Sequence, residues 1–177
     1  MKNAFLISLM FLSYFSFGQQ SKKNIVTEKF SYKNSIEFEL FGHGSFYSID
    51  YERLILNKDK TKTLGQIGFA YYPERTGVIP LWIPISINQL ISFNANHLEF
   101  GIGQIIINDE SPDGKDDYKL FGSLKIGYRY QKPNGRFLIK AAFTPIIDYW
   151  DEIDKNIHGE KLVDFIYWGG IAVGYNF

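Results

Sequence analysis

Apolar and polar residues alternate with a period of two along most of the chain, most clearly in residues 164–177. One face of this stretch is apolar, with aromatic residues toward its ends, and the other face is mostly small. The apolar face comprises Phe165, Tyr167, Gly169, Ile171, Val173, Tyr175 and Phe177. Because side chains alternate between the two faces of a β-strand, this pattern predicts a strand.

Seven earlier stretches show the same alternation, which brings the predicted number of strands to eight. The expected ranges are 34–42, 46–55, 64–72, 78–91, 96–107, 117–131 and 136–147. An even number of strands joined in chain order predicts an all-β fold, an eight-stranded antiparallel up-and-down transmembrane β-barrel. Pro80 and Pro84 each remove a backbone donor, so we expect a bulge or an unpaired stretch near them.

The connections between these strands alternate between the two ends of the barrel. If the N-terminus is periplasmic, the outer loops are 42–45, 73–77, 108–116 and 148–162, and the inner turns are 57–63, 92–95 and 132–135. The two longest connections therefore fall on the outer side, which is typical of transmembrane barrels.

The start of the chain predicts export. Lys2 precedes the apolar run 4–17, and Ser16 and Gly18 provide a small-residue cleavage site before Gln19. The run is too short to span a membrane comfortably, so a signal peptide is favoured over an uncleaved anchor. The predicted organisation is a signal peptide at 1–18, a flexible periplasmic lead-in at 19–33 and the barrel at 34–177.

Composition narrows the function classes. The chain has no Cys, which excludes disulfides and a Cys-linked lipid anchor, and its formal net charge of zero gives no electrostatic case for nucleic acid. Aromatic residues make up 18% of the chain and 16 residues are Gly. This combination favours many strands over helices.

The same alternation would also fit a soluble, lipocalin-like barrel. Large aromatic side chains on one face, tyrosines near strand ends and the export signal favour the membrane form. We therefore expect a bacterial outer-membrane protein with both termini periplasmic, most simply a monomer. Its expected partners are outer-membrane lipid, lipopolysaccharide and the barrel-assembly machinery, and no cofactor is expected.

Charged residues fall on the face that would line the barrel interior. The predicted lumen cluster consists of Glu52, Glu99, Arg129, Asp50, Lys125 and Lys140. An eight-stranded interior has room for side chains only, and buried charges must pair, so we expect Arg129 to bridge Glu52, Glu99 or both. The network is interpreted as structural first, with a proton or ion path as the alternative.

Several stretches together resemble an uncharacterised family of small outer-membrane β-barrel proteins. They are residues 47–53 (YSIDYER), 97–103 (HLEFGIG), 127–131 (GYRYQ), Thr144-Pro145 and 169–177. The resemblance implies an architecture similar to the OmpA and OmpX barrels. The terminal strand ending in Phe also resembles the assembly signal of such barrels, which would assign Tyr175 and Phe177 to recognition during assembly.

Motifs that could carry chemistry are few. His43 and Ser45 resemble the His-x-Ser of outer-membrane lipid A deacylases of the PagL type, although a Gly-flanked turn explains the same residues. Residues 109–114 resemble the opening of an EF-hand loop, but Leu120 stands where its last ligand belongs. His43, His97 and His158 lack metal-ligand spacing.

We expect a structural role or an interaction role through the outer loops. An enzymatic activity is not expected. Two alternatives stay open: a lipid A or phospholipid-modifying enzyme that uses His43 and Ser45, and a small hydrophobic ligand binder with a lateral opening near Pro80 and Pro84. Acidic loop residues, including Asp148, Asp151, Glu152 and Asp154, are interpreted first as parts of solvated loops, with contact to divalent cations at the lipopolysaccharide surface as the alternative.

Overall fold

The computed structural model describes residues 29–71, 81–110, 116–148 and 164–177. Every regular element in this part of the chain is a strand. The strands are β1 (Asn34–Leu40), β2 (Tyr47–Asn57), β3 (Thr61–Tyr71), β4 (Leu81–Phe93), β5 (Asn96–Glu110), β6 (Asp116–Gln131), β7 (Phe137–Phe143), β8 (Ile146–Asp148), β9 (Asp164–Ile166) and β10 (Gly169–Asn176). None of the described residues forms a helix of the length and apolarity needed to cross a membrane.

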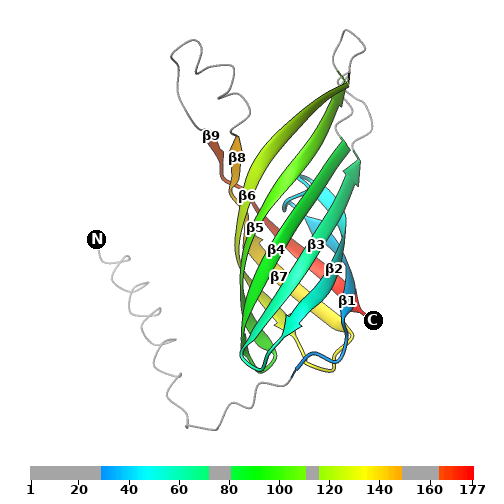
Figure 1. Cartoon of the computed structure of the whole chain (residues 1–177), viewed down its shortest axis with the longest axis vertical. Helices are drawn as coiled ribbons and strands as arrows, with labels where there is room; N and C mark the ends of the chain where they lie inside the picture. Colours follow the sequence, from blue (N-terminus) through cyan, green and yellow to red (C-terminus); the bar gives the residue numbers. More distant parts are fainter. Residues whose placement is uncertain (1–28, 72–80, 111–115, 149–163) are drawn as a thin grey trace, which may run out of the picture.

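The ten strands close into an eight-stranded antiparallel barrel (Figure 1). Strands β1 to β6 pair in chain order, β6 pairs with both β7 and β8, and β10 closes the sheet by pairing with β7 and β1. Strands β7 and β8 are one barrel strand interrupted at Thr144 and Pro145, and β9 and β10 are one strand interrupted at Tyr167 and Trp168. The predicted fold class is therefore confirmed.

Pro84 leaves a gap on one side of β4. The β3–β4 register passes from Ile67↔Ile85 directly to Ala70↔Trp82, whereas on the other side Pro84 stays paired with Ile105 of β5. The interruption expected from the prolines is thus present on the β3 side, because Pro has no N–H to donate to the ladder. Pro80 lies outside the described residues.

The two ends of the barrel differ. The end at the bottom of Figure 1, here called the lower end, holds the short connections 58–60, 94–95 and 132–136, together with residues 29–33 and Phe177. At the opposite, upper end β3 to β6 rise well above the β1–β2 hairpin (Figure 1). The 41–46 turn of that hairpin folds into the barrel, because Gly42, His43 and Gly44 are all buried.

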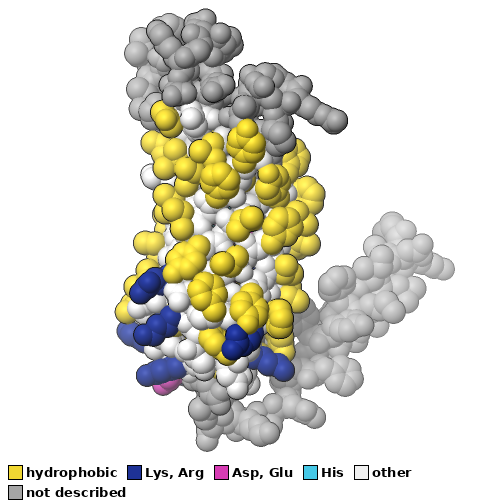
Figure 2. Space-filling model, turned by 90° about the vertical axis from the view of Figure 1, so that its right-hand side faces the viewer, with side chains coloured by type: hydrophobic (Ala, Val, Ile, Leu, Met, Phe, Trp, Pro, Cys, Tyr) yellow, Lys and Arg dark blue, Asp and Glu magenta, His cyan; other side chains and the backbone are white. Residues whose placement is uncertain are grey.

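The barrel is apolar outside and polar inside. Large hydrophobic side chains such as Phe38, Ile102 and Ile139 are 44%, 66% and 58% exposed. Hydrophobic side chains cover the middle of the face seen in Figure 2. The buried residues are mostly polar or charged. A water-soluble protein normally has the reverse distribution.

Residues 29–33, which end the predicted flexible lead-in, pack against the lower end. Phe30 is 6% exposed and lies in an apolar cluster with Leu64, Leu90 and Leu54. The Asn57 side chain holds its backbone through two hydrogen bonds, Phe30 N to Oδ1 at 3.1 Å and Nδ2 to Phe30 O at 3.0 Å. The start of this lead-in, 19–28, lies outside the described residues.

Candidate functional site: the charged interior

Eight charged side chains project into the middle of the barrel and are almost fully buried. The set consists of Glu37, Glu39, Asp50, Glu52, Glu99, Lys125, Arg129 and Lys140. Each residue occupies a position of its strand whose side chain faces inward, so the alternation of the sequence identifies these residues. With five acids and three cations, the set is two positive charges short of balance if every group is ionised.

Arg129 of β6 is the centre of this cluster. Its Nη1 lies 2.7 Å from Glu52 Oε1 and 3.9 Å from both Glu37 Oε1 and Glu99 Oε2, and its Nε donates to Gln131 Oε1 at 2.7 Å. The guanidinium therefore joins acids from three different strands. A planar group with five donors suits this arrangement better than the single ammonium of a lysine.

Two lysines complete the cluster. Lys140 of β7 forms an ion pair with Glu37 of β1, although β10 lies between these strands, and its Nζ is 3.9 Å from Glu99 Oε1. Lys125 Nζ lies 3.6 Å from Glu99 Oε1 and donates to Gln66 Oε1 at 2.9 Å. The structure thus brings together Glu52, Glu99, Arg129, Lys125 and Lys140 of the predicted cluster.

Asp50 is the member of the predicted set that lies outside these ion pairs. Among the described residues neither Asp50 nor Glu39 has a salt-bridge partner; Asp50 Oδ2 accepts from Ser48 Oγ at 2.9 Å, and Glu39 Oε2 accepts from His43 N at 3.1 Å. Glycines make room for both acids: a Cβ at Gly68 would collide with the Asp50 carboxylate, and one at Gly42 with that of Glu39.

Below the ion pairs lies a hydrogen-bonded layer around His97. Its Nε2 is 3.0 Å from Gln131 O and its Nδ1 is 2.8 Å from Ser92 Oγ, which also accepts from Lys62 Nζ at 2.9 Å. A carbonyl can only accept, so Nε2 carries the proton, and the Ser92 hydroxyl can donate to Nδ1 of a neutral ring. The ring of Phe30 packs edge-on against His97 and lies 4.7 Å from Lys62 Nζ, which closes the layer from below.

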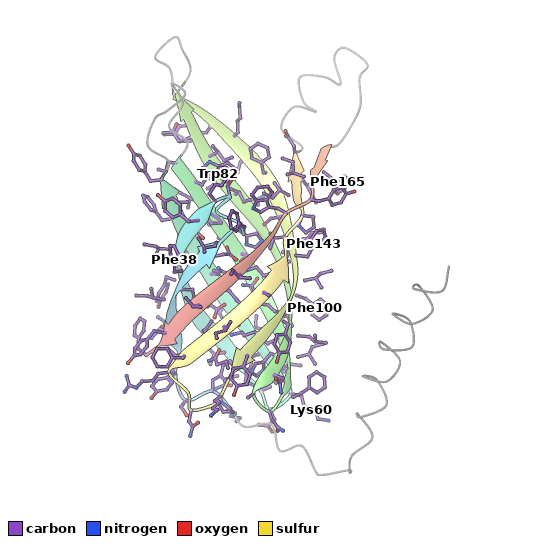
Figure 3. All side chains as sticks on the ribbon, turned by 180° about the vertical axis from the view of Figure 1, so that it is seen from behind. Phe38, Lys60, Trp82, Phe100, Phe143 and Phe165 are labelled. Atoms are coloured by element: carbon purple, nitrogen blue, oxygen red, sulfur yellow. The ribbon has the colours of Figure 1, made fainter. Side chains whose placement is uncertain are left out.

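Above the ion pairs the interior becomes apolar. Ile105 and Ile107 of β5 and Ile146 of β8 form a buried cluster, against which Trp82 and Phe121 pack. In Figure 3, Trp82 lies toward the upper end of the barrel. The charged layer is therefore enclosed by apolar side chains on both sides.

The lower interior contains little empty space. A cavity of about 10 Å³ beside Glu52 and Arg129 holds no more than about one water molecule. The lower part of the described interior is thus a packed polar core, as expected of an eight-stranded barrel.

The candidate catalytic pair does not meet. Ser45 turns at the edge of the 41–46 turn, where its backbone has φ 65° and its carbonyl accepts from Trp168 Nε1 at 3.2 Å. His43 is buried, and its backbone N–H donates to Glu39 Oε2 at 3.1 Å. No hydrogen bond joins the two side chains in the described structure, so a base and nucleophile are not assembled here.

Of the other candidates from the sequence, some lie within the described residues and some lie outside them. Tyr175 faces outward at the lower end of β10, and Phe177 exchanges two backbone hydrogen bonds with Asn34. Loop 111–115 and His158 lie outside the described residues, so the EF-hand-like stretch 109–114 is only partly covered. Within the described ranges no group of three or more metal-ligating side chains converges.

The sequence interpretation left out three residues that matter to the interior. Glu37 was among the inward-facing acids but not in the predicted cluster, and Gln66 has the right parity without a charge to mark it. Phe30 precedes the first strand in a polar stretch without alternation. Only the inward parity of Glu37 and Gln66 could have identified any of the three.

Fold and interior together define a closed eight-stranded antiparallel barrel with an apolar exterior and a charged, packed core. Its fold is similar to that in the crystal structure of the N-terminal β-barrel domain of Pseudomonas aeruginosa OprF, with a TM-score of 0.53 and 12% sequence identity. The likeness covers 85% of this chain and 100% of that one, and at this identity it supports the fold alone. No protein-family model matches the chain, and no curated protein sequence matches it either.

Proposed function

We propose that the chain is an integral outer-membrane β-barrel protein with a structural or interaction role, whose packed core stabilises the barrel and conducts nothing. The observation that carries this proposal is the inverted distribution of side chains: charges lie inside and large hydrophobic residues cover the outside. Exposing that surface to water would be costly, whereas a bilayer covers it.

The proposed orientation places the lower end in the periplasm. Short turns and both described chain ends lie there, and the strand ends that flank the longest connections of the sequence lie at the other end, as in bacterial barrels. In this orientation the acidic connections of the upper end would meet lipopolysaccharide through divalent cations. That the chain acts as a monomer is part of the same proposal.

Fractionation tests the location. The protein should separate with outer membranes and migrate differently on gels with and without boiling, because a closed barrel resists detergent until heated. Its refolded form should produce no steady conductance in planar bilayers. Recovery as a soluble periplasmic monomer would contradict the membrane assignment, and a stable conductance would contradict the packed core.

Assembly by the barrel-assembly machinery is tested at the terminal strand. Deleting residues 175–177 removes the outward-facing Tyr175 and the hydrogen bonds between Phe177 and Asn34 that end the β1–β10 seam. We expect little folded, membrane-inserted protein in cells. The matched control is Phe177→Tyr, which keeps an aromatic terminus and should assemble; normal levels of the deletion variant would argue against the assignment.

A further inference from the structure

The lower rim of the barrel is strongly basic. The described exposed residues there include seven cations, Lys29, Lys33, Arg53, Lys58, Lys60, Lys132 and Arg136, and one acid, Asp59. Every exposed Lys or Arg side chain of the described residues lies at this rim. Figure 2 shows Lys and Arg gathered below the apolar band, and Figure 3 labels Lys60 at the same end.

One of these cations is held in place. The Arg136 guanidinium donates to the Tyr175 hydroxyl and lies 5.4 Å from the Tyr32 ring centroid and 5.7 Å from that of Tyr175. The Phe137 ring packs edge-on against Tyr175. A guanidinium fixed among amphipathic rings at the border of an apolar band is positioned for phosphate, which it can bind through two parallel hydrogen bonds.

An apolar trough begins a short way above this point, at Ile139 and Val173, and runs up the outer surface. Two hollows of about 360 and 480 Å³ follow β7 and β10, and they share Ala141 and Ile171, so they form one continuous groove. Small residues, Ala141 and Gly169, form its floor, and Phe38 and Phe143 belong to its walls. Figure 3 looks onto β7 and β10, which lie side by side here.

The depth from the top of the trough to Arg136 matches one leaflet. The lining of the trough on β7 runs from Ile139 to Phe143, and from Arg136 to Phe143 a strand advances about 23 Å. At the usual strand tilt this corresponds to a depth of roughly 15 Å, half of the hydrocarbon thickness of a bilayer. An acyl chain that follows the trough would thus leave its headgroup at the level of Arg136.

We propose that this face binds an anionic glycerophospholipid of the leaflet at the lower rim, with an acyl chain in the trough and the phosphate on Arg136 and Lys132. The inference rests on the proposed membrane insertion. Charge complementarity favours an anionic headgroup, because the described exposed side chains of the lower rim comprise seven cations and one acid. The same basic rim lies on the side away from the acidic connections, so lipopolysaccharide is not its ligand.

Native mass spectrometry of the folded protein released from detergent micelles tests this site. Phosphatidylglycerol and phosphatidylcholine with identical acyl chains are added in equal amounts. The wild type should retain phosphatidylglycerol in preference, and the K132Q/R136Q variant should lose that preference by roughly fivefold for each cation removed. The matched control is K58Q/K60Q, which removes the same charge from a turn of the same rim away from the trough and should change it less than twofold.

The trough is tested separately. Ala141→Leu fills the floor and should reduce retention of both lipids, whereas Gly65→Leu adds the same bulk on the outer face of β3 and should not. Equal retention of the two lipids by the wild type, or equal losses in K132Q/R136Q and K58Q/K60Q, would overturn the site.

Folding is checked by heat-modifiable gel mobility for each variant. If K132Q/R136Q does not fold, Arg136→Lys takes its place, with a smaller loss of preference expected, and the wild-type preference should fall with added salt. A wild type that inserts into phosphatidylcholine nanodiscs but shows no preference for phosphatidylglycerol contradicts the lipid site and leaves the barrel proposal standing.

Discussion

The lower and upper halves of the barrel use the same strands but are stabilised differently. In the lower half β1, β10 and β7 pair without interruption, and the interior is filled by ion pairs above the Phe30 cluster. In the upper half β7 gives way to β8, β10 to β9, and the β3–β4 ladder skips two pairs, while the interior is lined by Ile105, Ile107 and Ile146.

This difference links the wall of the barrel to its contents. A buried ion pair offsets its desolvation only when its geometry is held closely, and the uninterrupted pairing of β1, β10 and β7 provides that rigidity around Glu37 and Lys140. Apolar side chains adapt to an irregular wall, because their packing has no directional requirement. The buried charges are therefore concentrated in the lower half, where β1, β10 and β7 pair without interruption.

The largest expected effect comes from removing the centre of the ion pairs. Arg129→Met leaves Glu52 buried without its ion-pair partner, which should lower the free energy of unfolding by roughly 3–5 kcal/mol. Urea unfolding of the refolded protein in detergent, followed by Trp fluorescence, measures this loss. The double variant Glu52→Gln/Arg129→Met should recover most of it, because the unpaired charge of Glu52 is gone. Glu99 keeps Lys125 and Lys140 as partners in both variants.

An exposed arginine provides the control for Arg129. Arg53→Met removes the same charge from the lower rim, where the side chain is exposed, and should leave unfolding unchanged within error. A loss in Arg53→Met as large as in Arg129→Met would show that total charge, and not the buried cluster, sets the stability.

The second prediction compares the truncation of one buried apolar side chain in the lower half of the barrel with that of one in the upper half. Phe30→Ala should cost about 3 kcal/mol, because the Asn57 clamp keeps the backbone from closing the space left below His97. Ile105→Ala should cost about 2 kcal/mol, because its large neighbours in the less regular upper half can shift toward it. The same urea series measures both, and a larger loss for Ile105→Ala would reverse the proposed order of rigidity.

The smallest effect should have the opposite sign. Asp50 is buried without an ion-pair partner in the described structure, so Asp50→Asn removes an unbalanced charge and should stabilise the barrel by about 1 kcal/mol. Glu52→Gln, its matched control on the same strand, breaks the contact with Arg129 and should destabilise. If both substitutions lower the free energy of unfolding equally, the charge of Asp50 is stabilised by its surroundings as well as that of Glu52.

The alternation of the sequence predicted most of the barrel. Expected and observed strand ends agree within about three residues for β1 to β6, since the period of two directly reflects which face is buried. The breaks at Thr144–Pro145 and Tyr167–Trp168 were not expected. The first break is bonded on both sides: Thr144 N donates to Trp168 O of the second break at 2.7 Å, and Pro145 O accepts from Leu124 N of β6 at 3.0 Å.

For the interior, the sequence predicted only which side chains face inward. The pairing of Arg129 with Glu52 follows from two inward positions at similar depth and is present in the structure. The separation of Asp50 depends on which strands stand opposite one another at each level, and the folding of Phe30 under the barrel depends on tertiary hydrogen bonds. Neither leaves a periodic signal in one sequence.

The ion pair between Lys140 and Glu37 has a consequence for the order of folding. The two residues lie on strands separated by β10, and Gly174 of β10 is paired with Glu37 on one side and with Leu138 on the other, where a Cβ would approach Glu37 Cγ to 2.8 Å and Leu138 Cγ to 3.0 Å. The contact needs the last strand to join the first at the correct register. It therefore disfavours wrong closure: a shift of one residue would turn Glu37 or Lys140 to the outer face and lose the ion pair.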